Sequence, residues 1–334
     1  MTRHASNSER AEPDFPPAGT PSEPVGIGLR YPYYKEVLET DLTLGWLEVH
    51  PENYFGGGAH RHFLTEARKK YQISLHAVGL SLGSTNPVSE THLQNFKELI
   101  DIYNPFNISD HASWSASGNA HLNDLMPLPY TRESLDALCR NIDRTQKFFG
   151  RKILLENPSS YVAFAHNEMT EYEFMNRAAA MTGCGILLDI NNIFVQAHNH
   201  GYDAWEYIDA IEQSPVGEMH LAGHTEKDAG DYKILIDTHN RPVRREVWDL
   251  YEHAIKRFGV IPTLIEWDQD FPTLANLVAE ADKARAVIKH CHPERSAKRE
   301  AEGSLTSPFC TDPSTARLRR SARDDGNEKI HAAE

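Results

Sequence analysis

Short apolar runs recur along the chain, and longer segments with the periodicity of amphipathic helices lie between them. We expect strands at residues 25–29, 46–50, 73–78, 107–110, 152–156, 185–190, 217–221 and 262–267. Helices are expected near residues 33–39, 60–70, 90–101, 131–148, 169–182, 203–213, 243–258 and 272–289. Short apolar strands that alternate with helices indicate a parallel sheet covered by helices. Eight such units predict an α/β fold, a single (β/α)8 TIM barrel.

The two ends of the chain have a different composition. Residues 1–24 are rich in Pro, Ser, Glu and Ala, and residues 291–334 are rich in Ser, Arg and Asp, with few large apolar side chains. Such segments bury too little apolar surface to order themselves. We therefore expect disordered N-terminal and C-terminal extensions on either side of a catalytic barrel domain at residues 25–290. The connections after the third, fourth and seventh strands are predicted to be long loops, and His198 and His200 are assigned to a loop.

Composition and charge narrow the class of protein. With 334 residues, 40% of them hydrophobic, the chain can bury one large core, and it has no apolar run long enough to span a membrane and no signal-peptide core. A cytoplasmic protein without a membrane partner is expected. Most of the net charge of −14 lies in the central domain, which disfavours nucleic acid as a partner. The four cysteines lack paired spacing, which favours reduced thiols over a cysteine metal site: Cys139, Cys184, Cys291 and Cys310.

Most of the predicted strands end on a histidine or a carboxylate. In a TIM barrel the C-terminal ends of the strands meet at one face, so these side chains should converge. The residues collected there are His50, His76, Asp110 or His111, Glu156, Asp189, His220 and Glu266. Carboxylates packed together repel one another or become protonated, and bound cations are the economical compensation. The pattern predicts a metal centre.

Two further segments add ligands of the same kind. Asp237-Thr238-His239 would place a carboxylate and an imidazole on the same side of an extended segment, and Asn191-Asn192 would add an amide just past Asp189. Nitrogen and oxygen ligands without thiolate suit iron, manganese or zinc, and Glu156 could bridge two ions. Neighbours on a strand face opposite ways, so one of Asp110 and His111, and one of Asn191 and Asn192, should coordinate. Spacing does not decide which one, nor which metal.

The order of these residues resembles the metal-site pattern of the xylose-isomerase-like barrel superfamily, which includes trinuclear zinc apurinic endonucleases. A closer resemblance, over residues 25 to about 290, is to the DUF692 family of multinuclear non-haem iron-dependent oxidative enzymes. The stretches that carry it are LEVHPENY at 47–54, SDH at 109–111, LENP at 155–158, LDINN at 188–192 and HLAGH at 220–224.

The resemblance implies an oxidoreductase of RiPP biosynthesis (RiPPs are ribosomally synthesised, post-translationally modified peptides) that uses two or three iron ions and O2. Its substrate would be the cysteines of a ribosomally made precursor peptide, presented by a small partner protein. Carried over by position, Glu156 would bridge irons, with Asp189, His220 and Glu266 on one, His76 and His111 on a second, and Asn192, Asp237 and His239 on a third. Catalytic roles are assigned to Glu156, Asp237 and His239. Asn192 stands where the zinc endonucleases have a histidine, which favours the iron family.

Other residues near the ligands are expected to support them or to contact the substrate: Glu48, His50, Glu52, Asn53, Asp110, Asn191 and His224. Three alternatives remain. A zinc phosphodiesterase would need a basic groove, and a sugar isomerase would need a lysine near a strand end, whereas Lys152 begins its strand. A non-catalytic metal-binding module would bind metal without consuming O2. The sequence does not say which cysteine modification is made.

Overall fold

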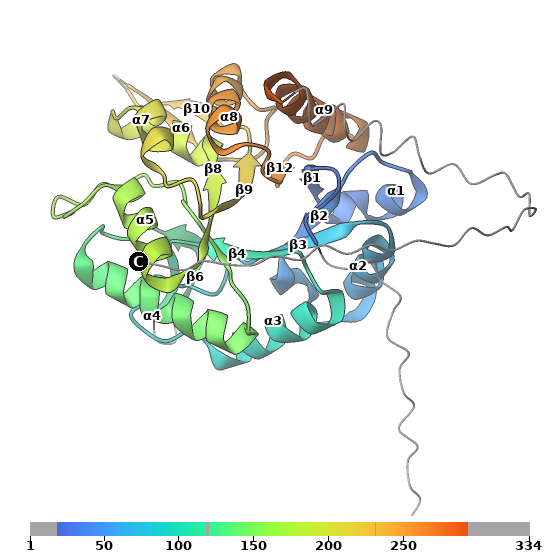
Figure 1. Cartoon of the computed structure of the whole chain (residues 1–334), viewed down its shortest axis with the longest axis horizontal. Helices are drawn as coiled ribbons and strands as arrows, with labels where there is room; N and C mark the ends of the chain where they lie inside the picture. The colour runs from blue at the N-terminus through green and yellow to red at the C-terminus, as the bar shows by residue number, and fades with distance from the viewer. Residues whose placement is uncertain (1–18, 118–119, 231, 293–334) are drawn as a thin grey trace, which may run out of the picture. The chain divides into compact units, whose positions relative to one another are not determined.

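Eight parallel strands close into a barrel in the computed structural model, which describes residues 19–117, 120–230 and 232–292. Figure 1 shows the first strand, β1, beside the last barrel strand, β12. The order around the barrel is β1 (Val25–Gly28), β12 (Thr263–Ile265), β9 (Val216–Leu221), β8 (Gly185–Asp189), β7 (Leu154–Glu156), β4 (Asn107–His111), β3 (Gln72–His76) and β2 (Trp46–Val49). The predicted (β/α)8 barrel is confirmed.

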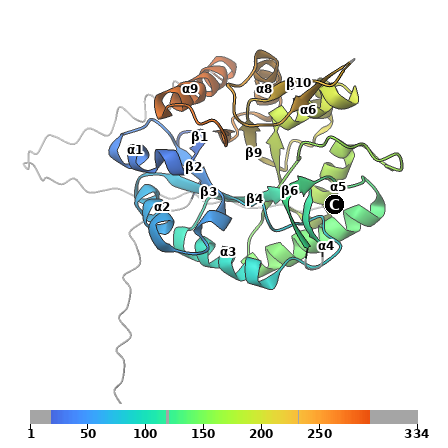
Figure 2. The same ribbon diagram turned by 180° about the vertical axis from the view of Figure 1, so that it is seen from behind.

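The helices surround the strands, as both views show (Figures 1 and 2). They are α1 (Tyr34–Glu39), α2 (Gly58–Lys70), α3 (Glu90–Tyr103), α4 (Arg132–Phe149), α5 (Glu171–Thr182), α6 (Ile190–His200), α7 (Ala204–Ala210), α8 (Arg245–Phe258) and α9 (Leu274–Cys291), with 3-10 turns at Tyr31–Tyr33 and Pro51–Tyr54. Helix α4 illustrates the local rules. The Thr131 hydroxyl caps its start, Leu135, Leu138 and Ile142 face the core, and Gly150 ends it with a left-handed backbone.

The N-terminal end of the barrel is closed by Trp46. Its ring is fully buried, and its Nε1 donates a hydrogen bond to the carbonyl of Pro24 over 3.1 Å. The ring lies so close to Gly26 that an added Cβ there would come within 2.5 Å of it. Because this end is filled, the C-terminal end is left for a site.

Two hairpins and one helix differ from the expected loops. β5 (Trp114–Ser117) pairs with β6 (Ala120–Met126), and β10 (Thr225–Asp228) pairs with β11 (Lys233–Ile236). The polar segment Thr225–Asp228 has no apolar alternation, so its pairing leaves no mark in the sequence. Helix α6 begins without a break after β8, because Asp189 ends the strand and its Oδ1 accepts a hydrogen bond from the backbone N–H of Asn192 over 2.7 Å. His198 and His200 lie in the last turn of α6, so their assignment to a loop was wrong.

The predicted disordered extensions fall mostly on residues 1–18 and 293–334, which lie outside the described residues, so the domain limits stay a prediction. Within the described part of the chain, no helix combines the length and the apolar character needed to cross a membrane.

Candidate metal centre

A cavity of about 160 Å³ lies at the C-terminal ends of the barrel strands. Most of its lining is made of side chains that can ligate a cation. These are His50, His76, His111, Glu156, Asn192, Asp237, His239, Glu266 and Asp268. Most of the residues expected to converge at the strand ends do line this cavity, whereas Asp189 and His220 lie outside its lining.

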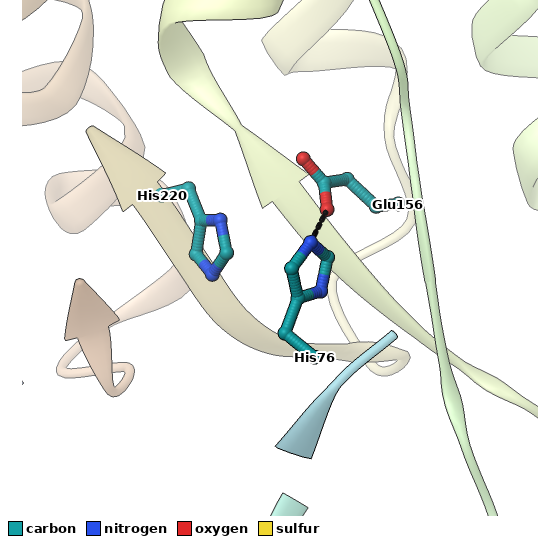
Figure 3. Close-up of side chains that lie close together, drawn as sticks. All are labelled: His76, Glu156 and His220. Atoms are coloured by element: carbon teal, nitrogen blue, oxygen red, sulfur yellow. Dashed lines mark ion pairs between the residues drawn. The ribbon is translucent and has the colours of Figure 1, made fainter. Parts of the chain in front are cut away.

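The first cluster joins strands β3, β4 and β7. His111 and Glu156 are neighbours in the register of β4 and β7, so their side chains share one face. The Nε2 atoms of His76 and His111 each lie 3.2 Å from Oε2 of Glu156. Figure 3 shows the His76 ring directed at this carboxylate, with His220 beside it. Oε2 has no hydrogen bond to the described residues, and such an orphaned oxygen between two imidazoles suits a cation.

The opposite ring nitrogens of these two histidines are held in place. Nδ1 of His76 lies 2.8 Å from the Ser109 hydroxyl, and Nδ1 of His111 lies 3.3 Å from Oδ1 of Asp110. A metal-binding histidine commonly bonds its second nitrogen to such a partner, which fixes the ring and its tautomer. Both Nε2 atoms are thereby directed into the cavity.

The second cluster joins β8, β9 and the end of β12. Asp189 and His220 are register neighbours, and Nδ1 of His220 lies 3.2 Å from Oε2 of Glu266. One ligand atom from each of these three residues lies within 4.8 Å of the others. On its other side, Nε2 of His220 lies 3.1 Å from Oε2 of Glu48 and 3.3 Å from Oε1 of Glu218, so its N–H can point away from the cavity. Oδ2 of Asp189 has no hydrogen bond to the described residues.

The third cluster comes from α6 and the segment after β11. Nε2 of His239 lies 2.7 Å from Oδ1 of Asp237, and Oδ1 of Asn192 faces them without a hydrogen bond to the described residues. The segment is not extended at His239, whose φ of 46° is left-handed. The expectation of an extended segment at residues 237–239 was therefore wrong. Asp237 and His239 both line the cavity because the backbone turns at His239, and not because side chains alternate along a strand.

The two pairs of neighbouring candidates differ in their position relative to this cavity. His111 and Asn192 line it, whereas Asp110 and Asn191 do not. Oδ2 of Asp110 accepts the backbone N–H of Leu80 over 2.8 Å. Nδ1 of His224 lies 2.8 Å from Oδ1 of Asn191, whose Nδ2 donates to Asp237 over 2.7 Å. His224 and Asn191 thus orient a cavity carboxylate from behind.

Two of the residues expected to support the ligands or to contact the substrate do not line this cavity. Glu52 lies 3.2 Å from Nε2 of His92, and its Oε1 accepts the backbone N–H of Val78 over 3.2 Å; Asn53 is exposed. His50 does line the cavity, with Nδ1 3.1 Å from the carbonyl oxygen of His76.

Sequence reasoning missed Arg30, Asp268 and Glu218. Nε of Arg30 donates to Asp268 over 2.7 Å, and its NH2 lies 3.7 Å from Glu266. Glu218 stands two residues before His220, and Asp268 two residues after Glu266. Their even spacing from a recognised strand-end ligand places them on the same face, and this parity could have identified both.

The cluster is rich in buried negative charge. Burial raises the pKa of Glu156 to about 7, against the pull of His111 and His220, and burial with the nearby Glu156 and Asp237 raises the pKa of Asp189 well above its ordinary value. Burial opposes ionisation of Glu266 too, but His239 and His220 hold its pKa at about 2. Arg30 compensates only one side of the cluster. The nearby carboxylates raise the pKa of His111 to about 9 and the pKa values of His220 and His239 well above the ordinary value, so without a metal ion these imidazoles hold protons that a cation would displace. Together the carboxylates and imidazoles form a nitrogen–oxygen donor set that divalent metal ions fit.

A larger hollow of about 1080 Å³ adjoins the cavity and shares Val78, Leu125 and Asp268 with it. Its walls are residues 78–89 and the β5–β6 hairpin. No lysine or arginine occurs among its described lining residues. The hollow therefore offers an extended, uncharged to acidic approach to the three ligand clusters.

Comparison with known proteins gives a family. Residues 24–289 match the model of the family described as RiPP precursor modification enzyme MbnB/TglH/ChrH. A UPF0276 protein of Vibrio parahaemolyticus is 48% identical over 278 residues, which cover 83% of this chain and 96% of the relative. A UPF0276 protein of Psychromonas ingrahamii is 46% identical, over 78% of this chain and 92% of the relative.

Solved structures with the same fold are distant in sequence. D-psicose 3-epimerase of Clostridium cellulolyticum, solved with D-tagatose, gives a TM-score of 0.53 at 10% identity, over 80% of this chain and 98% of that one. A xylose isomerase-like TIM barrel protein of Mycobacterium smegmatis, in complex with magnesium, gives 0.52 at 12% identity, over 81% and 98%. At this identity the likeness concerns the fold alone.

Proposed function

The chain belongs to the RiPP precursor modification enzyme family MbnB/TglH/ChrH, and on this basis we propose that it is an iron-dependent oxidoreductase that modifies cysteine residues of a precursor peptide. The observation that carries the proposal is the group of three ligand clusters around Glu156. Glu156 and Asn192 line the cavity, and each has a side-chain oxygen without a hydrogen bond to the described residues, as does the buried Asp189 of the second cluster. Two or three iron ions, with O2 as co-substrate, account for that arrangement.

The ligands of the proposed ions follow from the clusters. One ion would be held by His76 and His111, one by Asp189, His220 and Glu266, and one by Asn192, Asp237 and His239, with Glu156 as the bridge. Bound iron would supply redox capacity toward O2 and the Lewis acidity that favours a cysteine thiolate at neutral pH.

Neighbouring side chains would hold the metal ligands in position and accept the thiol proton. Ser109 and Asp110 hold the imidazoles of His76 and His111, while Glu48 and Glu218 accept the Nε2–H of His220. Arg30 anchors Asp268 and Glu266 at the rim. His50 lies in the cavity lining, with its Nε2 3.9 Å from Asp268, and would take the thiol proton as the cysteine binds.

The adjoining hollow would receive the peptide. Its extent of about 1080 Å³ exceeds what a single side chain fills, and it leads to the cavity past Val78 and Leu125. A small partner protein that presents the peptide, and a cytoplasmic location where such peptides are made, belong to the same proposal.

The two hydrolytic or isomerising alternatives lack their features in the described residues. The cavity lining contains no lysine, which a sugar isomerase of the expected type would need there. The adjoining hollow has no basic side chain that would attract a nucleic-acid backbone. Neither alternative gains an observation in its favour.

The test is metal analysis of protein purified without oxygen, followed by O2 uptake with cysteine-containing peptides encoded beside the gene. We expect at least two irons per active chain. The Glu156→Gln variant should lose iron and lose activity, because an amide cannot bridge two cations.

Glu212→Gln, an exposed change on the loop after α7, is the matched control and should keep both iron and activity. Fewer than two irons in the active protein, or full activity after loss of Glu156, would overturn the proposal. Iron binding without O2 uptake with any such peptide would identify a non-catalytic metal module instead.

A further inference from the structure

A second pocket of about 420 Å³ lies beside the metal centre but shares no lining residue with it. It is formed by residues 160–172 together with side chains from α6 and α7 and the residues that join them. Its walls are mostly apolar and aromatic, including Leu128, Phe164, Met169 and Tyr172. The volume is that of a small-ligand site.

A carboxyl group without a full set of partners is buried in this pocket. Glu171 is 7% exposed, and its Oε2 accepts a hydrogen bond from Nε2 of Gln196 over 3.0 Å. The hydroxyl of Tyr130 also interacts with this carboxyl group, but Oε1 has no hydrogen bond within 3.5 Å to the described residues. The hydroxyl of Tyr207, 1% exposed, also lacks one there. Buried polar groups left in this state are costly and mark sites that a ligand completes.

Helix capping does not account for the burial of Glu171. It is the first residue of α5, but the start of this helix is already capped by Thr170 and Glu173, whose side chains and backbone N–H groups bond reciprocally. Glu173 is exposed, as a carboxylate in a first helical turn ordinarily is. Glu171 is therefore turned inward for a reason other than the helix.

The charge around the pocket has one sign. Asp203 and Glu206 stand exposed in its lining, and the described lining contains no lysine or arginine. The rings of Tyr130, Tyr172 and Tyr202 add aromatic surface. Aromatic walls with a buried carboxyl group are the surroundings in which an organic cation is held.

We propose that this pocket binds an organic cation on an apolar stem, an alkylammonium or alkylguanidinium group, with Glu171 and Tyr207 receiving its N–H donors. The stem lies against Phe164 and Met169. The same chemistry is carried by a lysine or arginine side chain of a bound peptide and by a free alkyl amine. The site is independent of the metal cluster, so it stands whether or not iron is the metal.

The test is calorimetric titration of the metal-loaded full-length protein with n-pentylammonium, and with 1-pentanol and pentanoate as neutral and anionic matches. The titration is run at about pH 9, because burial raises the pKa of Glu171 to about 8 and an alkylammonium group, with a pKa of about 10.4, is still charged there. Pentylammonium should saturate one site, and the other two should not bind. The Glu171→Gln variant should weaken binding of pentylammonium by about ten- to hundredfold, the loss expected for a charged hydrogen bond. Glu173→Gln is the control: it changes an exposed carboxylate two residues further along α5, and the affinity for pentylammonium should stay unchanged.

A second variant, Val162→Trp, tests the proposal independently in case Glu171→Gln does not fold. Val162 lies in the pocket lining and is 54% exposed, so Val162→Trp can block the entrance without disturbing the core. It should abolish pentylammonium binding and leave the metal content of the protein unchanged. Equal binding of pentanol, or unchanged affinity in both Glu171→Gln and Val162→Trp, would overturn the proposal.

The source of the cation is resolved by a pair of blocked pentapeptides with lysine or norleucine at the centre. Tighter binding of the lysine peptide than of pentylammonium assigns the site to a peptide side chain, and weaker binding assigns it to free amines. If neither the lysine peptide nor pentylammonium binds saturably, the proposal fails.

Discussion

The imidazoles of the metal centre owe their direction to the partners of their second ring nitrogens. Ser109, a neighbour of His76 in the register of β3 and β4, holds Nδ1 of that histidine at 2.8 Å. The same logic applies to His220, whose Nε2 faces Glu48 at 3.1 Å. The direction of each imidazole ring is therefore set by buried hydroxyl and carboxyl groups that do not line the cavity.

Ser109→Ala should weaken metal binding at His76 by about 10- to 100-fold, because the ring loses the acceptor that fixes its tautomer. Metal retained during dialysis against a graded series of chelator concentrations measures this. Ser84→Ala is the control, since Ser84 is also buried but its hydroxyl donates to the carbonyl of Ala116 over 2.9 Å. Equal metal retention by the two variants would contradict the role given to Ser109.

Glu171 should make stability depend on pH. Burial raises its pKa from 4.5 to about 8, so between these values the folded protein holds a proton that the unfolded chain releases. The contribution of Glu171 to the free energy of unfolding should therefore fall as pH rises through this window. The other titratable groups around the pocket are present in both the wild type and the Glu171→Gln variant, so their contributions cancel when the two are compared. These groups are Tyr130, His200, Tyr202, Asp203, Glu206 and Tyr207.

Urea unfolding of the wild type and of Glu171→Gln, at intervals from about pH 5 to about pH 8, gives the comparison. The stability of the wild type relative to the variant should decline steadily across the series. A constant difference would show that Glu171 is ionised like an exposed carboxyl group.

At the scale of elements, the segment between β9 and α8 delivers the third ligand cluster. It leaves β9, forms the β10–β11 hairpin and returns to the rim at Asp237 and His239. Gly223 marks where this segment packs on itself, because a Cβ there would lie 2.0 Å from the carbonyl oxygen of Arg241. The placement of His239 thus depends on close backbone contact outside any regular element.

Gly223→Ala should destabilise the protein by about 1–3 kcal/mol, the usual cost of overpacking, and should lower the metal content by displacing Asp237 and His239. Thermal unfolding and metal analysis measure the two effects. Gly56→Ala is the control, because an added Cβ meets no heavy atom within 4 Å there. Normal metal content in Gly223→Ala would show that the positions of Asp237 and His239 do not depend on this backbone contact.

The sequence predicted the barrel strands well but gave no sign of the two hairpins, for a physical reason. The barrel strands, and the outer helices other than α6, were predicted to within a few residues because burial forces a period of two or 3.6 on their apolar positions. The β10 strand carries only Thr, Glu, Lys and Asp, and is held by backbone bonds to β11. Backbone pairing of that kind has no side-chain period to detect.

At the scale of the molecule, the barrel keeps its apolar packing and its chemistry apart. Core side chains lie between strands and helices, Trp46 fills one end, and the polar clusters occupy the other. α9 packs on β1 and β12 at the seam where the barrel closes. The closing elements therefore end at Cys291.

A chain truncated after residue 292 should fold and keep its metal content, because α9 and the residues that line the metal cavity are retained. The free energy of unfolding should change by no more than about 0.5 kcal/mol, as for surface changes. Circular dichroism and urea unfolding of both chains test this. Loss of cooperative unfolding in the shorter chain would place part of the fold beyond residue 292.

The sequence by itself determined the barrel and the kinds of ligand at its rim, because strand period and strand-end position follow from local pattern. It did not decide which of Asp110 and His111, or which of Asn191 and Asn192, points into the site. Only the tertiary structure decided which member of each pair lines the cavity, since packing in the folded barrel sets the rotation of strand β4 and of helix α6, which carries the two asparagines. The same holds for Arg30, which reaches Asp268 across 238 residues, and for the left-handed turn at His239. Contacts between distant segments leave no period in the chain, so the shape of the cavity and the second pocket beside it could be found only in the folded molecule.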